Sequence, residues 1–247
     1  RTESQDYPKS ARTESQDYFR GITRTMLSIR DFQFFDPDAE YTITAGHLPH
    51  WQQPGATYFI TYRTHDSISG VAMERILRER DDWLGRNGID VRVTNWQERL
   101  RKLPPQHQQT FRRHFAVAFE NELDRLEGEC LLRQPELSSI VDDSLQRFDG
   151  DRYQLGAFVV MPNHIHVLAR IFPDRTMLQQ CYSWKHYQAR AINQSINQSG
   201  PFYQRESFDH LVRDGEHFWK FRRYIEDNPR KATLNDGEYR LYLPDIS

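Results

Sequence analysis

Residues 152–172 read RYQLGAFVVMPNHIHVLARIF. Two runs of mostly apolar and β-branched residues, 152–161 and 165–172, flank the pair Pro162–Asn163. Such residues favour strands, and Pro–Asn is a turn signal short enough to join antiparallel neighbours. The stretch therefore predicts a β-hairpin.

Segments on either side of this hairpin predict the other elements. Residues 56–63 are dense in β-branched and aromatic residues and follow the turn signal Pro54–Gly55, so they predict a first strand. This order of strands and helices predicts an α+β fold, with helices packed on one face of an antiparallel sheet. The helices are expected over residues 71–84, 106–126, 135–148, 177–196 and 216–227, the last of them stopped by Pro229.

The chain length of 247 residues suits one core with extensions. We expect an N-terminal extension over residues 1–50, partly disordered, and a folded domain over residues 51–240 with a helical insertion at about residues 85–135. Within the extension, the polar segment RTESQDY stands twice, at residues 1–7 and 12–18, and we exclude it from the fold because it has no apolar face. Residues 32–51, rich in Asp, Pro, Gly and His, predict an irregular approach to the domain.

Net charge, apolar runs and cysteine content bear on whether the protein binds nucleic acid, enters a membrane or is secreted. The formal net charge of -2 gives no global attraction to a polyanion, so a nucleic-acid surface must come from locally clustered Arg and Lys. No apolar run approaches the roughly 20 residues of a membrane helix, so no membrane partner is expected. The two cysteines form no CxxC pair and the N-terminus has no secretory apolar region, which favours a cytoplasmic protein.

His164 and His166 are separated by one apolar residue in the second predicted strand. Alternate residues of a strand face the same side, so both imidazoles project together and can bind one divalent metal ion. Two imidazoles leave open positions at which a phosphate oxygen can be polarised. By spacing alone, the same pattern also fits two polar residues on a solvated strand face.

The surroundings of this pair carry a family resemblance. The run VMPNHIHVL at residues 160–168 resembles the HUH signature, with U an apolar residue, of REP-associated tyrosine transposases. Three further blocks are similar to that family and stand in the same order: SWKHYQARAIN at 183–193, GPFYQRESFDHLVR at 200–213 and YIEDNPRKA at 224–232. One departure is Tyr203, where the family has Trp, which keeps a surface for stacking but loses the indole donor.

The resemblance implies a ferredoxin-like HUH nuclease core and a metal-dependent single-stranded DNA endonuclease and strand transferase. Such enzymes act at hairpin-forming repeats: a tyrosine attacks a phosphodiester, forming a 5′-phosphotyrosine and freeing a 3′-hydroxyl. No ATP is needed, because the covalent intermediate keeps the ester energy. Single-stranded or hairpin DNA is the implied partner, and the chain acts as a monomer or a homodimer.

The resemblance also assigns residues. Tyr224 matches the nucleophile, and Asn228, four residues later on the same helix face, matches the position of a third metal ligand beside His164 and His166. The expected cofactor is Mg²⁺ or Mn²⁺. Tyr187 is the rival nucleophile, and Arg222 and Arg223 are the cations expected to stabilise the phenolate. The candidates for DNA contact are Lys185, Arg190, Gln204, Arg205 and Arg213, interleaved with aromatic residues.

Purely structural explanations also fit some of these residues. A solvated helix face explains the basic residues nearly as well, and Arg205 also fits a scaffold ion pair with Glu206 or Asp209. Two other functions remain open: a catalytically degenerate protein that binds DNA hairpins without cutting them, and a metal-dependent phosphodiesterase that uses water. The first keeps the fold without the covalent step, and the second leaves Tyr224 unexplained.

Overall fold

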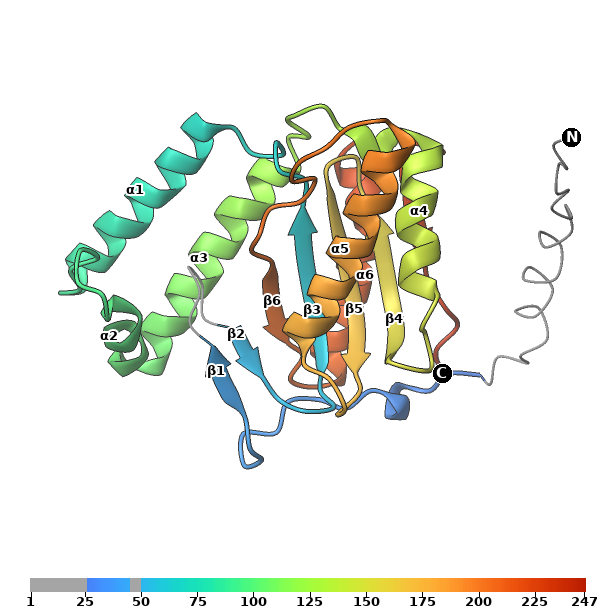
Figure 1. Cartoon of the computed structure of the whole chain (residues 1–247). Helices are drawn as coiled ribbons and strands as arrows, with labels where there is room; N and C mark the ends of the chain where they lie inside the picture. The colour runs from blue at the N-terminus through green and yellow to red at the C-terminus, as the bar shows by residue number, and fades with distance from the viewer. Residues whose placement is uncertain (1–25, 45–49) are drawn as a thin grey trace, which may run out of the picture.

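A five-stranded antiparallel sheet forms the centre of the computed structural model, which describes residues 26–44 and 50–247 (Figure 1). The spatial order of its strands is β6-β3-β5-β4-β7. The first four of these pair as in a ferredoxin-like sheet, which confirms the α+β fold class. The strands are β3 (Thr57–Arg63), β4 (Tyr153–Val160), β5 (His164–Ile171), β6 (Phe208–Leu211) and β7 (Arg240–Tyr242).

The predicted hairpin joins β4 to β5. Its turn is closed by a hydrogen bond from the Met161 backbone N–H to the His164 carbonyl, at 2.8 Å. The pairing is regular except for a bulge between Leu155 and Ala157, at Gly156. A Cβ atom at Gly156 would lie 2.9 Å from the ring of Phe218, so the missing side chain lets a helix approach the sheet closely here.

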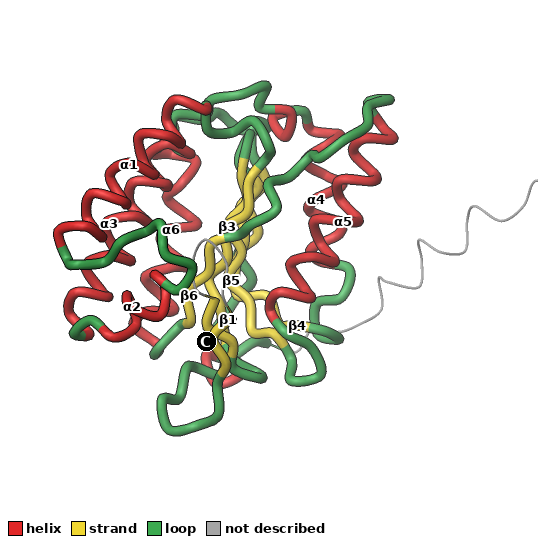
Figure 2. The backbone as a smooth tube through the Cα atoms, turned by 60° about the vertical axis from the view of Figure 1, so that its left-hand side comes forward, coloured by secondary structure: helices red, strands yellow, loops and turns green. Residues whose placement is uncertain are grey.

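Helices cover both faces of the sheet, which corrects the expectation of a single covered face. α4 (Pro135–Gln146) and α5 (Met177–Ser195) pack on one face and α6 (Gly215–Lys231) packs on the other (Figure 2). The strands are apolar toward both sides because both are buried, so β4 and β5 lack the alternation of a half-exposed sheet.

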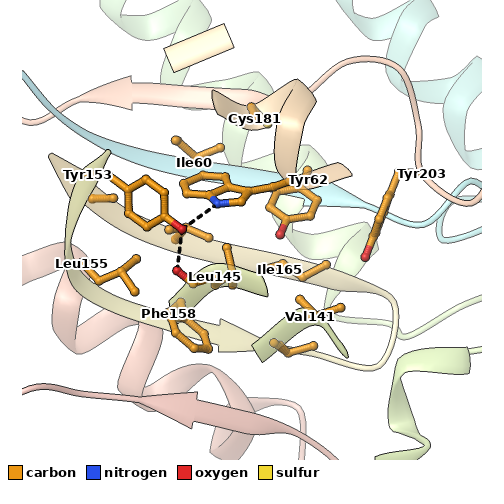
Figure 3. Close-up of a cluster of buried hydrophobic side chains, with 14 of the residues drawn as sticks. Ile60, Tyr62, Val141, Leu145, Tyr153, Leu155, Phe158, Ile165, Cys181 and Tyr203 are labelled. Carbon is orange, nitrogen blue, oxygen red and sulfur yellow. Dashed lines mark hydrogen bonds between the residues drawn. The ribbon is translucent and has the colours of Figure 1, made fainter. Parts of the chain in front are cut away.

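The face covered by α4 and α5 holds the larger core (Figure 3). A buried tyrosine ties both helices to it: the Tyr153 hydroxyl donates to the Leu145 carbonyl at 2.7 Å and accepts from the Trp184 indole at 3.1 Å (Figure 3). Tyr62 of β3 extends the same core and donates to Gln188 of α5 at 3.2 Å. These bonds join both helices and β3 into one scaffold.

The segment between β3 and α4 forms a helical insertion beside the sheet (Figure 1). It contains α1 (Gly70–Arg86), α2 (Trp96–Lys102) and α3 (Pro105–Leu123), followed by the short 3-10 helix η2 (Leu131–Arg133). It has a core of its own that includes Ile76 and Phe111. The end of α3 reaches the sheet, where the rings of Phe119 and Phe208 lie 4.4 Å apart between centroids.

The described residues before β3 pack against the rest of the molecule. After a short 3-10 helix, η1 (Ile29–Asp31), Phe32 packs on Phe218 with ring centroids 4.6 Å apart. β1 (Thr42–Thr44) and β2 (His50–Gln52) then pair in a separate two-stranded sheet, so the expected irregular approach is wrong over these residues. The duplicated RTESQDY segments lie outside the described residues.

α6 runs past Pro229, where the sequence predicts its end. Proline lacks a backbone N–H, but the last turn still closes through a bond from the Ala232 N–H to the Asn228 carbonyl, at 3.1 Å. The helix therefore ends at Lys231. Among the described residues, no helix combines the length and apolarity needed to cross a membrane.

Candidate active site

The two histidines lie side by side on the sheet face that α6 covers. His164 and His166 pair with Arg63 and Thr61 of β3, and their ring centroids are 4.7 Å apart. Their exposed fractions are 0% and 1%, which excludes the reading of a solvated strand face. The expectation that both imidazoles project to one side is met, and the side is the interior of the molecule.

Hydrogen bonds at Nδ1 orient both imidazoles. His164 Nδ1 lies 2.7 Å from Asn163 Oδ1, and Asn163 Nδ2 donates to the Glu127 carbonyl at 3.0 Å, which fixes the direction of that amide. An amide oxygen only accepts, so His164 carries its proton on Nδ1 and keeps the Nε2 lone pair free. His166 Nδ1 lies 2.7 Å from Thr61 Oγ1, a hydroxyl that can donate or accept. Such support of the distal nitrogen is typical of metal-ligating histidines.

Both imidazoles are neutral near physiological pH. Burial lowers the pKa of His164 to about 3, and the nearby Asn228 amide opposes this effect. Burial, together with His164 and Lys231, also lowers the pKa of His166 well below its ordinary value. Neutral imidazole is the form that binds divalent metals.

α6 brings two polar side chains to the histidines. The helix is capped by Asp214, whose carboxylate accepts from the His217 N–H at 2.7 Å, and Phe218 and Ile225 anchor it in the core. Tyr224 then lies against His166, with ring centroids 5.2 Å apart and nearly perpendicular planes. Asn228, one turn later and fully buried, adjoins both His164 and Tyr224.

Five polar atoms of these four residues are buried without a hydrogen-bond partner among the described residues. They are Nε2 of His164, Nε2 of His166, the Tyr224 hydroxyl oxygen, and both Nδ2 and Oδ1 of Asn228. Asn228 is close enough to influence the pKa values of its neighbours, but it makes no contact with the geometry of a hydrogen bond. Buried polar groups are nearly always paired, so this concentration makes the cluster the candidate site.

The chemistry of this donor set fits a divalent cation. Two imidazole nitrogens and an amide oxygen are acceptors of the kind that metals bind. In the described part of the chain, no three His, Cys, Asp or Glu side chains gather to hold a metal. An ion at the histidine pair would therefore take its third protein ligand from Asn228 or another oxygen donor.

Charged groups from two helices surround Tyr224. The Lys231 ammonium lies 4.9 Å from the centre of its ring. Burial raises the pKa of the Tyr224 phenol, and Glu120 and Asp124, from the end of α3, raise it further. Burial, with Asp124, also raises the pKa of Glu120 to about 7. No sequence pattern pointed to these two carboxylates, because they come from the insertion.

The two arginines expected to stabilise the Tyr224 phenolate do not lie beside its hydroxyl as predicted. Arg222 donates to the carbonyls of Pro244 and Gly156 and lies against Trp219, so its guanidinium braces α6. Arg223 is exposed. The rival nucleophile Tyr187 is 51% exposed on α5, across the sheet from the histidines, so the structure does not bring it to the site.

The predicted DNA-contacting residues divide into two groups. Lys185 donates to the Gln204 and Arg205 carbonyls, and the Gln204 amide donates to the His65 carbonyl, so both side chains hold the scaffold. Arg190, Arg205 and Arg213 are exposed. None of the five joins the cluster around His164 and His166.

Two neighbours in the same segment also differ from expectation. Tyr203 is 7% exposed and packs against Tyr62 and Phe202, so it presents no stacking surface. Asp209 contacts His50 of β2 through a short hydrogen-bonded ion pair instead of serving as a partner for Arg205. Burial lowers the pKa of His50, but the Asp209 contact outweighs it and the net pKa is raised.

No family model and no curated protein matches the chain. Among solved structures, it is similar to a REP-associated tyrosine transposase bound to a REP hairpin, with 12% sequence identity and a TM-score of 0.40. The match covers 76% of this chain and 74% of the other. A likeness this distant carries no argument about function, which has to come from the site itself.

Proposed function

We propose that the chain is a metal-dependent endonuclease and strand transferase for single-stranded DNA, acting at hairpin-forming repeats through a phosphotyrosine. The observation that carries the proposal is the gathering of His164, His166, Tyr224 and Asn228 with their polar atoms unpaired in one buried cluster. Two of these residues come from a strand and two from a helix far along the chain. A packing role explains none of the five unpaired atoms.

Nε2 of His164, Nε2 of His166 and Oδ1 of Asn228 are the atoms that would hold Mg²⁺ or Mn²⁺. When bound, the ion polarises a phosphate oxygen and stabilises negative charge on the attacking phenol oxygen. Asn163 keeps the His164 proton on Nδ1, away from the ligand side, and Thr61 holds Nδ1 of His166 in a hydrogen bond. The lowered pKa values of both histidines keep them in the ligand form.

Tyr224 is the proposed nucleophile. Its oxygen forms a bond to phosphorus while the bond between phosphorus and the 3′ oxygen breaks, and the phenol proton leaves as the 3′ oxygen acquires one. Attack by a 3′-hydroxyl on the phosphotyrosine reverses the step and restores the phenol. Lys231 over the ring favours the negative charge, whereas Glu120 and Asp124 oppose it.

The decisive experiment traps the adduct. Hairpin oligonucleotides from repeats flanking the encoding locus, each nicked so that the leaving strand diffuses away, are incubated with protein and Mn²⁺. We expect a covalent protein–DNA adduct that is lost in Tyr224→Phe and with EDTA. Tyr182→Phe removes the same hydroxyl from an exposed tyrosine on α5 and should leave the adduct unchanged. An adduct that survives in Tyr224→Phe refutes the assignment.

The second candidate is a protein that binds DNA hairpins without cutting them. It is favoured by one observation: Glu120 and Asp124 raise the pKa of Tyr224 and so oppose the phenolate. Hairpin binding with no adduct, across the same oligonucleotides and with Mn²⁺ present, would support it. Arg190, Arg205 and Arg213 are the exposed residues proposed to contact the DNA in either case.

A further inference from the structure

Arg63 is a buried cation next to the histidine pair. It is the last residue of β3 and pairs across the strands with His164, so both side chains leave the same face of the sheet. Only 6% of Arg63 is exposed. Arginine is rarely buried to this extent unless it is paired with an acidic group.

No such partner occurs in the described part of the chain. The single hydrogen bond recorded for the guanidinium runs from Nη1 to Ser67 Oγ, at 3.1 Å. Burial lowers the pKa of Arg63 to about 10, and no carboxylate contributes to that shift. A largely buried charge without a counter-charge is costly, and a bound anion would reduce that cost.

The local backbone holds Arg63 in place. Ser67, itself fully buried, donates its hydroxyl to the Thr64 carbonyl at 2.9 Å. Thr64 in turn is bonded through its backbone N–H and its hydroxyl to the Asn163 carbonyl, beside the histidines. The loop that holds the guanidinium is therefore bonded to the turn that orients His164.

From this placement we propose that Arg63 binds a phosphate group of the DNA strand, next to His164. A planar guanidinium presents parallel N–H donors that match two phosphate oxygens, and a phosphodiester supplies the missing negative charge. Arg63 thus aligns the phosphate beside the metal ligands. The identity of the ligand as DNA rests on the proposed function, whereas the phosphate chemistry rests on Arg63 alone.

The test uses thermal unfolding of the full chain in sodium phosphate and in sodium chloride of equal ionic strength. Phosphate should raise the melting temperature of the wild type and of the control Arg92→Met, an arginine whose side chain is 87% exposed on the insertion. Arg63→Met should lose most of this rise and should unfold no earlier than the wild type in chloride. An equal rise in both proteins, or early unfolding of Arg63→Met in chloride, makes Arg63 structural and overturns the proposal.

A second measurement does not depend on the folding of a variant. In the ¹⁵N NMR spectrum of the wild type, the Arg63 side-chain signals should shift on titration with inorganic phosphate. Absence of a shift at saturating phosphate overturns the proposal.

DNA binding separates this inference from the proposed function. With EDTA present, Arg63→Met should bind a fluorescent single-stranded oligonucleotide about tenfold more weakly, with a salt dependence reduced by about one ion. An adduct that never forms, together with an Arg63-dependent phosphate effect, refutes the nuclease but keeps the inference. An adduct that forms without any Arg63 dependence in these assays refutes the inference alone.

Discussion

The Thr61 hydroxyl lies 2.7 Å from Nδ1 of His166, across two paired strands and under a covering helix. This contact orients the ring of His166, which lies against Tyr224. It also links a residue of the first long strand to the proposed chemistry, although nothing around Thr61 in the sequence marks it as functional.

Replacing Thr61 with Val should therefore weaken both metal binding and the fold. The change keeps the shape but leaves His166 Nδ1 unpaired, at a cost of about 1–3 kcal/mol in the free energy of unfolding. Mn²⁺ affinity, measured by electron paramagnetic resonance, should fall roughly 10–100-fold. Thr94→Val, at an exposed position of the insertion, is the control and should change neither quantity. Unaltered Mn²⁺ affinity in Thr61→Val would show that the contact is dispensable.

Asn228 offers a direct test of the third ligand. Asn228→Asp replaces the amide by a carboxylate, a stronger metal ligand, so Mn²⁺ should raise its melting temperature more than it raises that of the wild type. Asn228→Ala should show the smallest rise of the three. Identical rises in all three proteins, measured by differential scanning fluorimetry, would remove Asn228 from the ligand set.

Glu120 predicts a pH dependence of stability. Its pKa is raised to about 7 by burial and by Asp124, against the nearby ammonium groups of Lys231 and Lys220. The folded state thus holds the proton more tightly than the unfolded state, so stability falls as pH rises from the ordinary carboxyl pKa toward 7 and stays reduced above it. Glu120→Gln removes this loss and should be more stable than the wild type at pH 8 by at most about 3 kcal/mol.

At pH 4 the stability gain of Glu120→Gln should vanish, because Glu120 of the wild type is then largely protonated in both the folded and the unfolded state. Urea unfolding at the two pH values measures the difference. An advantage of equal size at both pH values would mean that the substitution acts through packing and not through charge.

Gly156 tests how closely α6 must approach the sheet. The methyl group of Gly156→Ala would lie 2.9 Å from the Phe218 ring, and such overpacking costs about 1–3 kcal/mol. Gly85→Ala in α1 meets nothing within 4 Å and should be neutral or stabilising by up to about 1 kcal/mol. Urea unfolding compares the two, and a Gly156→Ala protein as stable as the wild type would show that α6 can shift without loss.

Local sequence patterns predicted the elements with long, regular signals. The β4–β5 hairpin and α5 lie within a residue of their expected ends. The strands β1, β2, β6 and β7 were missed because three or four residues are too few for a period of two to emerge. The predicted end of α6 before Pro229 was wrong for a different reason. A proline in the last turn removes a hydrogen bond without ending the helix.

The candidate site divides in the same way. His164, His166, Tyr224 and Asn228 could be chosen from motifs, because each motif lies within one strand or one helix. Their supporting residues could not, because strand register and the packing of the insertion bring them in from elsewhere. Lys185 and Gln204 illustrate the opposite error, since a basic or polar residue looks the same in sequence whether it faces DNA or holds two loops together.

Tyr224 and Asn228 stand one turn apart on a single rigid helix, while the two imidazoles belong to the sheet. The backbone positions of the two residues are thus fixed relative to each other, whereas the gap between helix and sheet can vary. Any tilt of α6 about its contact at Gly156 would withdraw the proposed nucleophile and the proposed third ligand in the same movement. A single hinge-like degree of freedom would then set both metal retention and reactivity, so substitutions far out on α6 should alter the two together.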